Sequence, residues 1–199
     1  MKPNRWDDYY ARKAREEKWL ARSVYKLQEI DRKFKLIHNG DQVLDLGCYP
    51  GSWSQYSLRK VGPKGEVIGI DQNPPQHLFA PGFRFIQADV FTADLEWLSA
   101  EISLRDVVLS DLAPPTTGIR IRDESRSLVL ARRALEIARA LLKPKGRFLC
   151  KIFEGEDLAW FKQDLSSDFR VIRSFRPKAT RKKSREVYLG GSGWMGVQT

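Results

Sequence analysis

The sequence predicts an α/β domain built on a mostly parallel, seven-stranded sheet with helices on both faces. Seven short apolar runs alternate with longer polar or amphipathic segments, and several of the runs stop at an aspartate. Alternating strands and helices are typical of parallel sheets in which a helix crosses over to the next strand. A chain of 199 residues is long enough for one such domain and short for two, so we expect residues 1–199 to form a single domain.

Each predicted strand is a short apolar run bounded by glycine, proline or aspartate. The first run ends in a turn with Gly47 and Gly51, and the next three stop at Asp71, Asp89 and Asp111. The carboxyl ends of parallel strands lie along one rim of a sheet, so these residues are expected to meet there. In chain order, the predicted strands span residues 43–46, 67–70, 83–88, 107–109, 147–153, 169–175 and 187–189.

The predicted helices are bounded by residues that cannot continue them. Gly62-Pro63 ends one helix, and Pro144 with Gly146 ends a long amphipathic one, because proline lacks the amide hydrogen and glycine favours a helix end. A short helical stretch also precedes the fourth strand. The other predicted helices span residues 7–34, 52–61, 124–142 and 156–165.

Residues 45–53 combine a strand end, a glycine turn and a helix start, the arrangement in which open α/β sheets bind ligands. The G-x-x-x-G spacing is neither a P-loop nor the G-x-G-x-x-G of most dinucleotide sites. Asp71 stands where an acidic residue in such folds accepts hydrogen bonds from ribose hydroxyls, and Asp89 could accept one from an adenine amino group. An aspartate at a strand end often only caps the next turn. The glycine turn and both acids together favour an adenosine cofactor.

The net charge of +10 is concentrated in two segments. Residues 1–35 contain 11 Lys and Arg against 6 Asp and Glu, residues 170–185 contain 8 against none, and the remainder is slightly acidic. Clustered Lys and Arg commonly neutralise phosphates, so both segments are predicted to bind a polyanion. The first segment also contains aromatic residues that could stack on bases or dock the helix on the sheet: Trp6, Tyr9, Tyr10 and Trp19.

Composition argues against several other classes of protein. No apolar run approaches the roughly 18 residues of a membrane span, and the charged N-terminus lacks the apolar core of a signal peptide. We therefore expect a cytoplasmic protein with no membrane partner. Cys48 and Cys150 lack Cys-x-x-Cys spacing and are interpreted as reduced structural thiols. His38 and His77 have no metal-like neighbours in the sequence, so no metal site is predicted.

Seven ordered segments extend together over nearly the whole chain: residues 22–27, 45–53, 70–71, 88–89, 110–114, 151–155 and 184–188. They resemble the motifs of the FtsJ family of S-adenosylmethionine-dependent RNA ribose 2′-O-methyltransferases. The resemblance implies a Rossmann-like methyltransferase fold with S-adenosylmethionine as cofactor. It implies a catalytic tetrad of Lys26, Asp111, Lys151 and Glu186. It implies cofactor contacts from Gly47, Gly51, Trp53, Asp71, Asp89 and Asp111.

The resemblance also implies a substrate. We expect a monomer that binds RNA rather than DNA, with residues 1–35 as a basic helical RNA-binding extension. The expected reaction is methyl transfer to the 2′-hydroxyl of a uridine of 23S rRNA in the large ribosomal subunit. Two alternatives stay open: a ribose methyltransferase of the tRNA anticodon loop, which residues 8–27 also resemble, and a non-catalytic RNA-binding module.

A ribose hydroxyl is too weak an acid to ionise at neutral pH unaided, so Lys151 is predicted either to accept its proton or to hold it by a hydrogen bond. Read singly, Lys26 could contact phosphate or be solvated, and Lys151 could point outward. Glu186 could simply pair with Arg185 or a nearby lysine. Two departures from the family pattern bear on geometry. Cys48-Tyr49 replaces small residues in the glycine turn, and Pro115 replaces a polar residue after the fourth strand.

Overall fold

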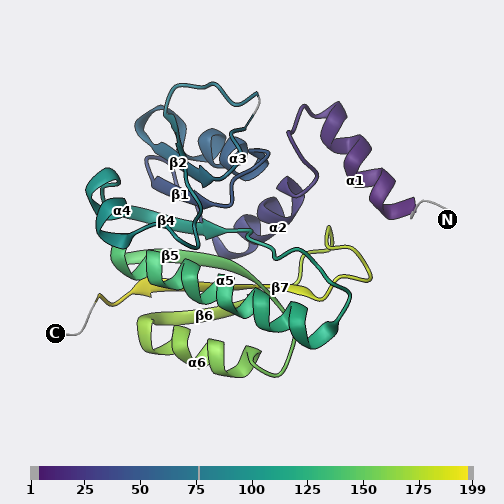
Figure 1. The fold of residues 1–199 in the computed structure, drawn as a ribbon. Helices are drawn as coiled ribbons and strands as arrows, with labels where there is room; N and C mark the ends of the chain where they lie inside the picture. Colours follow the sequence, from purple (N-terminus) through teal and green to yellow (C-terminus); the bar gives the residue numbers. More distant parts are fainter. Residues whose placement is uncertain (1–4, 76, 197–199) are drawn as a thin grey trace.

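A computed structural model describes the chain over residues 5–75 and 77–196 (Figure 1). Seven strands form one sheet in the order β3-β2-β1-β4-β5-β7-β6, and β7 is antiparallel to both of its neighbours while the other pairs are parallel. The predicted mostly parallel seven-stranded sheet is confirmed. The strands are β1 (Gln42–Leu46), β2 (Glu66–Asp71), β3 (Phe83–Gln87), β4 (Arg105–Ser110), β5 (Leu142–Phe153), β6 (Phe169–Phe175) and β7 (Glu186–Trp194).

Helices cover both faces of the sheet, as the sequence predicts. One face packs against α4, α5 and α6, and the other against α2 and α3 (Figure 1). Helix α1 lies at the side of the molecule, beyond α2 (Figure 1). The helices are α1 (Arg5–Glu16), α2 (Val24–Phe34), α3 (Ser52–Val61), α4 (Leu95–Glu101), α5 (Arg120–Leu141) and α6 (Leu158–Asp168), with a 3-10 turn at Gly62–Lys64.

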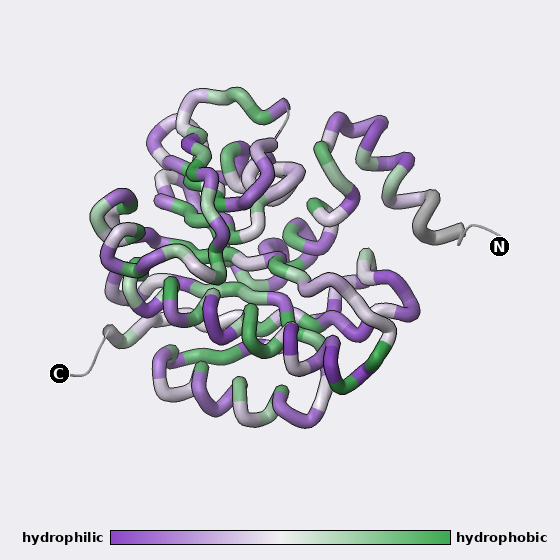
Figure 2. Tube along the Cα trace, viewed as in Figure 1, coloured by the Kyte–Doolittle hydropathy of each residue, from purple (hydrophilic) through white to green (hydrophobic). Residues whose placement is uncertain are grey.

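Alternation along the central strands divides the core into two layers, because successive side chains of a strand point to opposite faces. In β1, Leu44 and Leu46 pack towards α5, whereas Val43 packs towards α2. The hydrophobic colours of Figure 2 accordingly run through the central strands, while α1 is largely hydrophilic. The face between α2 and the sheet is the one that carries the charged residues described below.

The predicted single helix over residues 7–34 is wrong in its middle. Lys18 has a left-handed backbone (φ 58°) and separates α1 from α2. The break allows Trp19 to pack against Tyr56, with ring centroids 6.2 Å apart, and against the guanidinium of Arg59 at 4.0 Å. A tertiary contact of Trp19 therefore outweighs the local helix propensity of this segment. The residue pattern alone does not reveal such a contact.

Three further boundaries differ from the predicted ones. Helix α5 begins at Arg120, one turn before residue 124, and β5 starts at Leu142 because the Pro-Gly segment enters the sheet with a register shift. Strand β7 continues past residue 189 through Gly190 and Gly191. A Cβ on Gly191 would lie 2.5 Å from the ring of Phe169, so glycine there makes room for a core aromatic side chain on β6. Because glycine has a low propensity for strands, the sequence pattern does not predict this part of β7.

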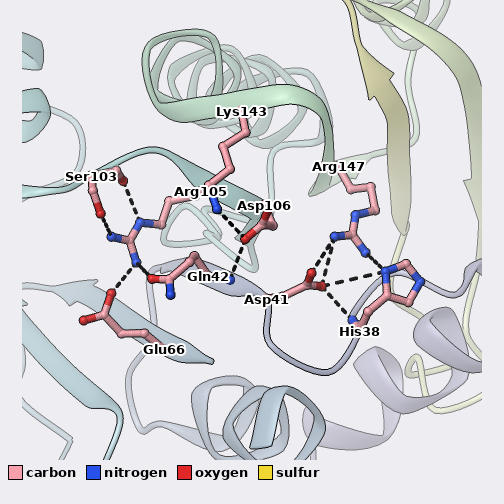
Figure 3. Close-up of polar contacts among 9 residues, drawn as sticks. All are labelled: His38, Asp41, Gln42, Glu66, Ser103, Arg105, Asp106, Lys143 and Arg147. Atoms are coloured by element: carbon pink, nitrogen blue, oxygen red, sulfur yellow. Dashed lines mark hydrogen bonds and ion pairs between the residues drawn. The ribbon is translucent and has the colours of Figure 1, made fainter. Parts of the chain in front are cut away.

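The amino-end rim of the sheet is held together by charged groups (Figure 3). One guanidinium nitrogen of Arg147 lies 2.9 Å from both carboxylate oxygens of Asp41, and the other contacts Nδ1 of His38. Lys143 donates to Asp106 at 2.8 Å, and the same Asp106 oxygen accepts the amide of Gln42. These bonds tie the starts of β1, β4 and β5 together.

A second pair at this rim links β2 to β4. Arg105, which is 1% exposed, donates to Glu66 at 2.5 Å and to the carbonyl oxygen of Ser103. Burial of a guanidinium is tolerated because its donors find acceptors. The rim lies at the strand ends opposite Asp71 and Asp111, so these charges stabilise the sheet without entering the site.

We predict that Arg147→Met lowers the free energy of unfolding by roughly 3 kcal/mol, because it leaves the carboxylate of Asp41 buried without its cation. Urea denaturation measures the change. The matched variant Arg132→Met breaks an exposed pair with Asp164 and should cost less than about 1 kcal/mol. Equal losses in the two variants would contradict the assigned role of the rim.

Candidate functional site

Strand alternation brings the predicted tetrad to the face covered by α2. Leu109 of β4 and Leu149 of β5 pack in the α2 layer, and Asp111 and Lys151 follow each of them by two residues. On β7, Glu186 precedes the buried Tyr188 of the same layer by two residues. Lys26 comes from α2 itself, the helix that covers this face. The four residues therefore meet between one helix and three adjacent strands.

Lys151 is held by two bonds to one residue. Its ammonium donates to the carbonyl oxygen of Asp111 at 2.5 Å and to the carboxylate Oδ1 at 2.9 Å, and its side chain is 6% exposed. An ammonium has three hydrogens, so one remains for another acceptor. Lys151 does not point outward to solvent, the alternative that its sequence context leaves open.

Tyr188 is a member of this cluster that the sequence did not mark as functional. Its hydroxyl donates to Oδ1 of Asp111 at 2.7 Å, and β-pairing places it opposite Lys151. Burial, followed by the nearby carboxylates of Asp111 and Glu186, raises the pKa of the Tyr188 hydroxyl well above 10. The available signal was the two-residue spacing from Glu186, which puts both side chains on one face of β7.

Lys26 and Glu186 form the second charged pair of the cluster. The Lys26 ammonium lies 2.6 Å from Oε1 of Glu186 and 5.9 Å from the ring centroid of Tyr188. The pair has side-chain exposures of only 14% and 10%. Glu186 thus contacts the lysine of α2, whereas the Arg185 guanidinium pairs with Glu124.

The charge state of Asp111 reflects these neighbours. Burial on its own would raise the pKa of this carboxyl, but the charges of Lys151 and Lys26 and the hydrogen bond from Tyr188 outweigh burial, so the pKa is lowered. Asp111 is therefore an anion at neutral pH. It can fix both the ammonium of Lys151 and the hydroxyl of Tyr188.

The charged cluster opens into a cavity of about 540 Å³, which we call cavity B. Lys26, Lys151 and Glu186 lie in its wall. Basic residues of the segment between β6 and β7 also line the cavity, which therefore attracts anions. These basic residues are Arg181, Lys183 and Arg185, and Arg22 adds a further cation from the chain just before α2.

A second cavity of about 570 Å³, cavity A, lies at the carboxyl ends of β2 and β3. Asp71 and Asp89 stand on its rim, and Leu112 and Val129 give it an apolar wall. A carboxylate near an apolar slot suits a ribose and a flat base, because the acid accepts hydroxyl hydrogens while the wall packs against the ring. Asp71 and Asp89 are therefore brought together, as predicted.

Cavities A and B meet at Ala113, which lies in the wall of both. Asp111, two residues earlier in the chain, contacts Lys151 in the wall of cavity B. The loop that follows is fixed by Asp123, whose carboxylate accepts the Thr117 amide at 2.8 Å and the Gly118 amide at 3.2 Å. Ligands in the two cavities would thus be nearest to each other at Ala113, and Lys151 lies in the wall of cavity B.

The glycine turn is shaped by packing inside the protein. A Cβ on Gly47 (φ 74°) would lie 2.6 Å from Leu112, and one on Gly51 (φ 114°) would lie 2.9 Å from Leu20. Both glycines lie outside the walls of cavities A and B. The indole of Trp53 is 3% exposed and donates to the Ser23 carbonyl at 3.0 Å, so only its backbone amide in the first turn of α3 is left for a ligand.

The side chains of the unusual Cys48-Tyr49 pair point in different directions, one into the core and one towards solvent. Cys48 is buried, and its Sγ occupies the space above Gly69, where a Cβ would approach to 2.8 Å. The Tyr49 side chain is 47% exposed, and its amide donates to Asp71 at 3.0 Å. The tyrosine thus points outward and helps to fix the carboxylate of Asp71 through its backbone.

The N-terminal aromatics that the sequence suggested for base stacking have different positions. The Trp6 side chain lies outside the described residues. Trp19 and Tyr10 pack within the protein, the latter 5.3 Å from the Tyr25 ring, whereas Tyr9 is 45% exposed. Docking on the rest of the chain therefore accounts for at least two of the four.

Asp45 of β1 is a buried carboxyl behind the glycine turn. Its Oδ2 accepts the Ser54 hydroxyl at 2.6 Å, and its Oδ1 has no partner among the described residues. Burial raises the pKa of Asp45 to about 7, the Ser54 hydrogen bond lowers it in part, and the charges of Asp111 and Asp71 add to the rise. The bond to Ser54 joins β1 to α3 across the turn.

Over the described parts of the chain, no helix is long and apolar enough to cross a membrane. The same residues contain no group of three or more His, Cys, Asp or Glu side chains placed to hold a metal ion.

The strand order and the two cavities at the carboxyl ends of the strands define the class of Rossmann-like α/β proteins. A family model described as FtsJ-like methyltransferase matches residues 19–194. The chain therefore belongs to the FtsJ-like methyltransferase family. This confirms the family that the sequence motifs indicated.

Relatives are similar over most of their length. The chain is 45% identical over 185 residues to a protein of Syntrophobacter fumaroxidans, which covers 92% of this chain and 94% of that protein. It is 44% identical over 187 residues to a protein of Bdellovibrio bacteriovorus, which covers 92% of this chain and 95% of that protein. Both relatives are named ribosomal RNA large subunit methyltransferase E.

Solved structures agree on the fold. A Plasmodium falciparum protein described as a ribosomal RNA methyltransferase superposes with a TM-score of 0.79 at 28% identity, over 89% of this chain and all of that one. A Clostridium thermocellum protein gives a TM-score of 0.57 at 17% identity over 85% of this chain and 95% of that chain, and supports the fold alone.

We predict that Asp45→Asn removes a pH dependence of stability. The raised pKa means that the unfolded chain ionises Asp45 near its usual 3.8 while the folded chain ionises it near 7. The contribution of Asp45 to the free energy of unfolding is therefore largest below about pH 4, where the carboxyl is protonated in both states, and it is lost as the pH rises towards 7. Urea unfolding at pH 5 and pH 8 should show a smaller loss on going to pH 8 in the asparagine variant than in the wild type.

The matched variant for this measurement is Ser54→Ala. It removes a hydrogen bond that lowers the pKa of Asp45, so the loss of stability between pH 5 and pH 8 should become larger. An identical pH dependence in all three proteins would contradict the assignment.

Proposed function

We propose that this protein transfers a methyl group from S-adenosylmethionine to a ribose 2′-hydroxyl of ribosomal RNA. The observation that carries the proposal is the junction of an acid-rimmed cavity with a basic one beside the Lys151–Asp111 pair. The names of the relatives support large-subunit rRNA as the substrate class. A uridine of 23S rRNA remains our expected target within that class.

Cavity A suits the adenosine part of the cofactor. Asp71 is proposed to accept the ribose hydroxyls and Asp89 the adenine amino group, while Leu112 and Val129 pack against the ring. Amides at the first turn of α3, that of Trp53 included, are left for the polar end of the cofactor, with Gly47 and Gly51 shaping the turn. When bound, S-adenosylmethionine supplies an electrophilic methyl group on a sulfonium.

Cavity B suits the RNA nucleotide. Its cations can neutralise the phosphates that flank the reacting ribose, and the reacting nucleotide must be unpaired to enter it. The new C–O bond forms as the bond between the methyl group and sulfur breaks. The proton of the hydroxyl oxygen passes to Lys151 in its neutral form, or to water if Lys151 only orients the hydroxyl. Lys151 is the residue proposed to contact that oxygen. Two of the three hydrogen-bonding positions on its nitrogen are used by Asp111, and the third is available to the substrate.

The other tetrad members are proposed to act on Lys151 and on the substrate position. Asp111 and Tyr188 fix the ammonium of Lys151, so the hydroxyl meets a preorganised partner. Lys26 and Glu186 form a neutral pair at the cavity wall and add no net charge to the centre. Positioning of the hydroxyl in line with the methyl group is then the main contribution of the site.

The substrate is tested by incubating the purified protein with labelled S-adenosylmethionine and, separately, free 23S rRNA, large ribosomal subunits and tRNA. We expect label on the large-subunit rRNA, at the 2′-hydroxyl of one uridine, after nuclease mapping. Label on the anticodon loop of tRNA would favour the tRNA alternative. A protein that binds these RNAs and labels none would be the non-catalytic module.

We predict that Lys151→Met lowers kcat by at least about 100-fold, because the hydroxyl loses its contact, while calorimetry still shows cofactor binding in cavity A. Lys143→Met, which removes a lysine from the opposite rim, should keep the wild-type kcat. Wild-type kcat in Lys151→Met would sink the role assigned to this residue.

Lys151→Arg separates the two possible roles of the lysine. Arginine donates hydrogen bonds but keeps its proton at neutral pH. Activity well above that of the methionine variant would indicate that residue 151 orients the hydroxyl. Activity as low as that of the methionine variant favours proton acceptance.

A further inference from the structure

A third cavity, cavity C, lies beside α2, next to the helix face that carries Lys26. It has a volume of about 370 Å³ and is formed by α1, α2, the last residue of β6 and the chain that follows it. Its α2 wall consists of Tyr25, Gln28, Glu29 and Arg32, which follow the three- and four-residue spacing of one helix face. Ser23 and Lys26, on a neighbouring face of the same segment, line cavity B instead.

The side chains of cavity C combine aromatic surface with positive charge. Tyr10 and Phe175 provide half-buried aromatic surface, whereas Tyr25 is buried and packs against the Tyr10 ring at 5.3 Å. Arg32 and Lys178 are exposed cations with no carboxylate partner among the described residues. Glu29 has its carboxylate engaged with the backbone, since its two oxygens accept the amides of Lys178 at 2.7 Å and Ala179 at 3.0 Å.

Lys13 is a third cation in the wall of cavity C, and its ammonium already has two partners within the protein. Its ammonium lies 4.9 Å from the Tyr25 ring centroid and 3.7 Å from Glu17. The cations that remain available are therefore Arg32 and Lys178. Aromatic side chains beside such cations are the combination that binds single-stranded nucleic acid, by stacking on bases and neutralising phosphates.

One basic segment joins cavity C to cavity B. Phe175 and Lys178 line cavity C, and Arg181 and Lys183 line cavity B, with no acidic residue between positions 170 and 185. Arg22 bridges the two regions, because it donates to the Ala179 carbonyl at 3.0 Å and lies 5.6 Å from the Tyr10 ring. A polyanion leaving cavity B along this segment reaches cavity C.

We propose that cavity C is a second RNA subsite, which holds a nucleotide of the same strand whose ribose enters cavity B. Its phosphate binds between Arg32 and Lys178, and its base packs against the aromatic wall. The proposal rests on the proposed function, since it assumes that RNA occupies cavity B. The subsite contributes to RNA affinity, and it leaves the methyl-transfer step and cofactor binding unchanged.

The test uses the double variant Arg32→Ala/Lys178→Ala and a fluorescein-labelled 23S rRNA fragment that the wild type methylates. Anisotropy titrations between about 50 and 200 mM salt should show a Kd raised roughly tenfold and a slope of log K against log salt reduced by about 0.7 for each lost phosphate contact. The kcat at saturating RNA and the Kd for S-adenosylmethionine should equal those of the wild type.

The matched control is Lys64→Ala/Lys145→Ala, which removes two exposed lysines near the amino ends of β2 and β5. It should bind RNA as the wild type does. Lys178→Ala alone, in an exposed loop, should shift Kd in the same direction and guards against a folding defect at Arg32.

A Kd and salt slope of Arg32→Ala/Lys178→Ala equal to those of the wild type would overturn the subsite while the proposed function stands. The same holds if the control variant loses as much affinity as the double variant. A wild-type protein that neither binds nor methylates RNA would overturn the proposed function, and the subsite with it.

Discussion

The pairing of Lys151 with Asp111 is the interaction on which the rest of the site depends. Both residues continue the inward alternation of adjacent strands into the layer beneath α2, where an unpaired charge would be costly. Each lysine of the cluster has a carboxylate within 2.9 Å, so four charged groups can lie largely buried beside cavity B. Tyr188 completes the arrangement by donating to the same oxygen of Asp111.

The two rims of the sheet have different roles. At the amino-end rim, ion pairs such as Arg147–Asp41 and Arg105–Glu66 tie strand starts together (Figure 3). At the carboxyl-end rim, charges face two cavities that meet at Ala113. A sheet clamped at one rim can hold reactive groups at the other in fixed positions, which is what transfer between two bound molecules requires.

The surface around α2 extends this arrangement towards the RNA. The helix buries Leu27 and Ile30 against the sheet, presents Lys26 to cavity B and presents Arg32 to cavity C. The basic segment after β6 passes both cavities. Under the proposed function, one helix and one segment would position the RNA strand relative to Lys151, and the cations of cavity C lie apart from the groups proposed to carry the chemistry.

The sequence by itself determined the fold class and the family, because strand periodicity and ordered motifs are local properties of the chain. Its motifs also predict a tetrad of Lys151, Asp111, Lys26 and Glu186, and the structure brings these four residues together. Tertiary structure alone decided which residues pair with which, the position of Tyr188 and the break at Lys18. It also decided that Trp53 is buried and that Gly191 extends β7 beside Phe169. These features depend on contacts between residues far apart in the chain, and the strength of such contacts cannot be predicted from a local sequence pattern.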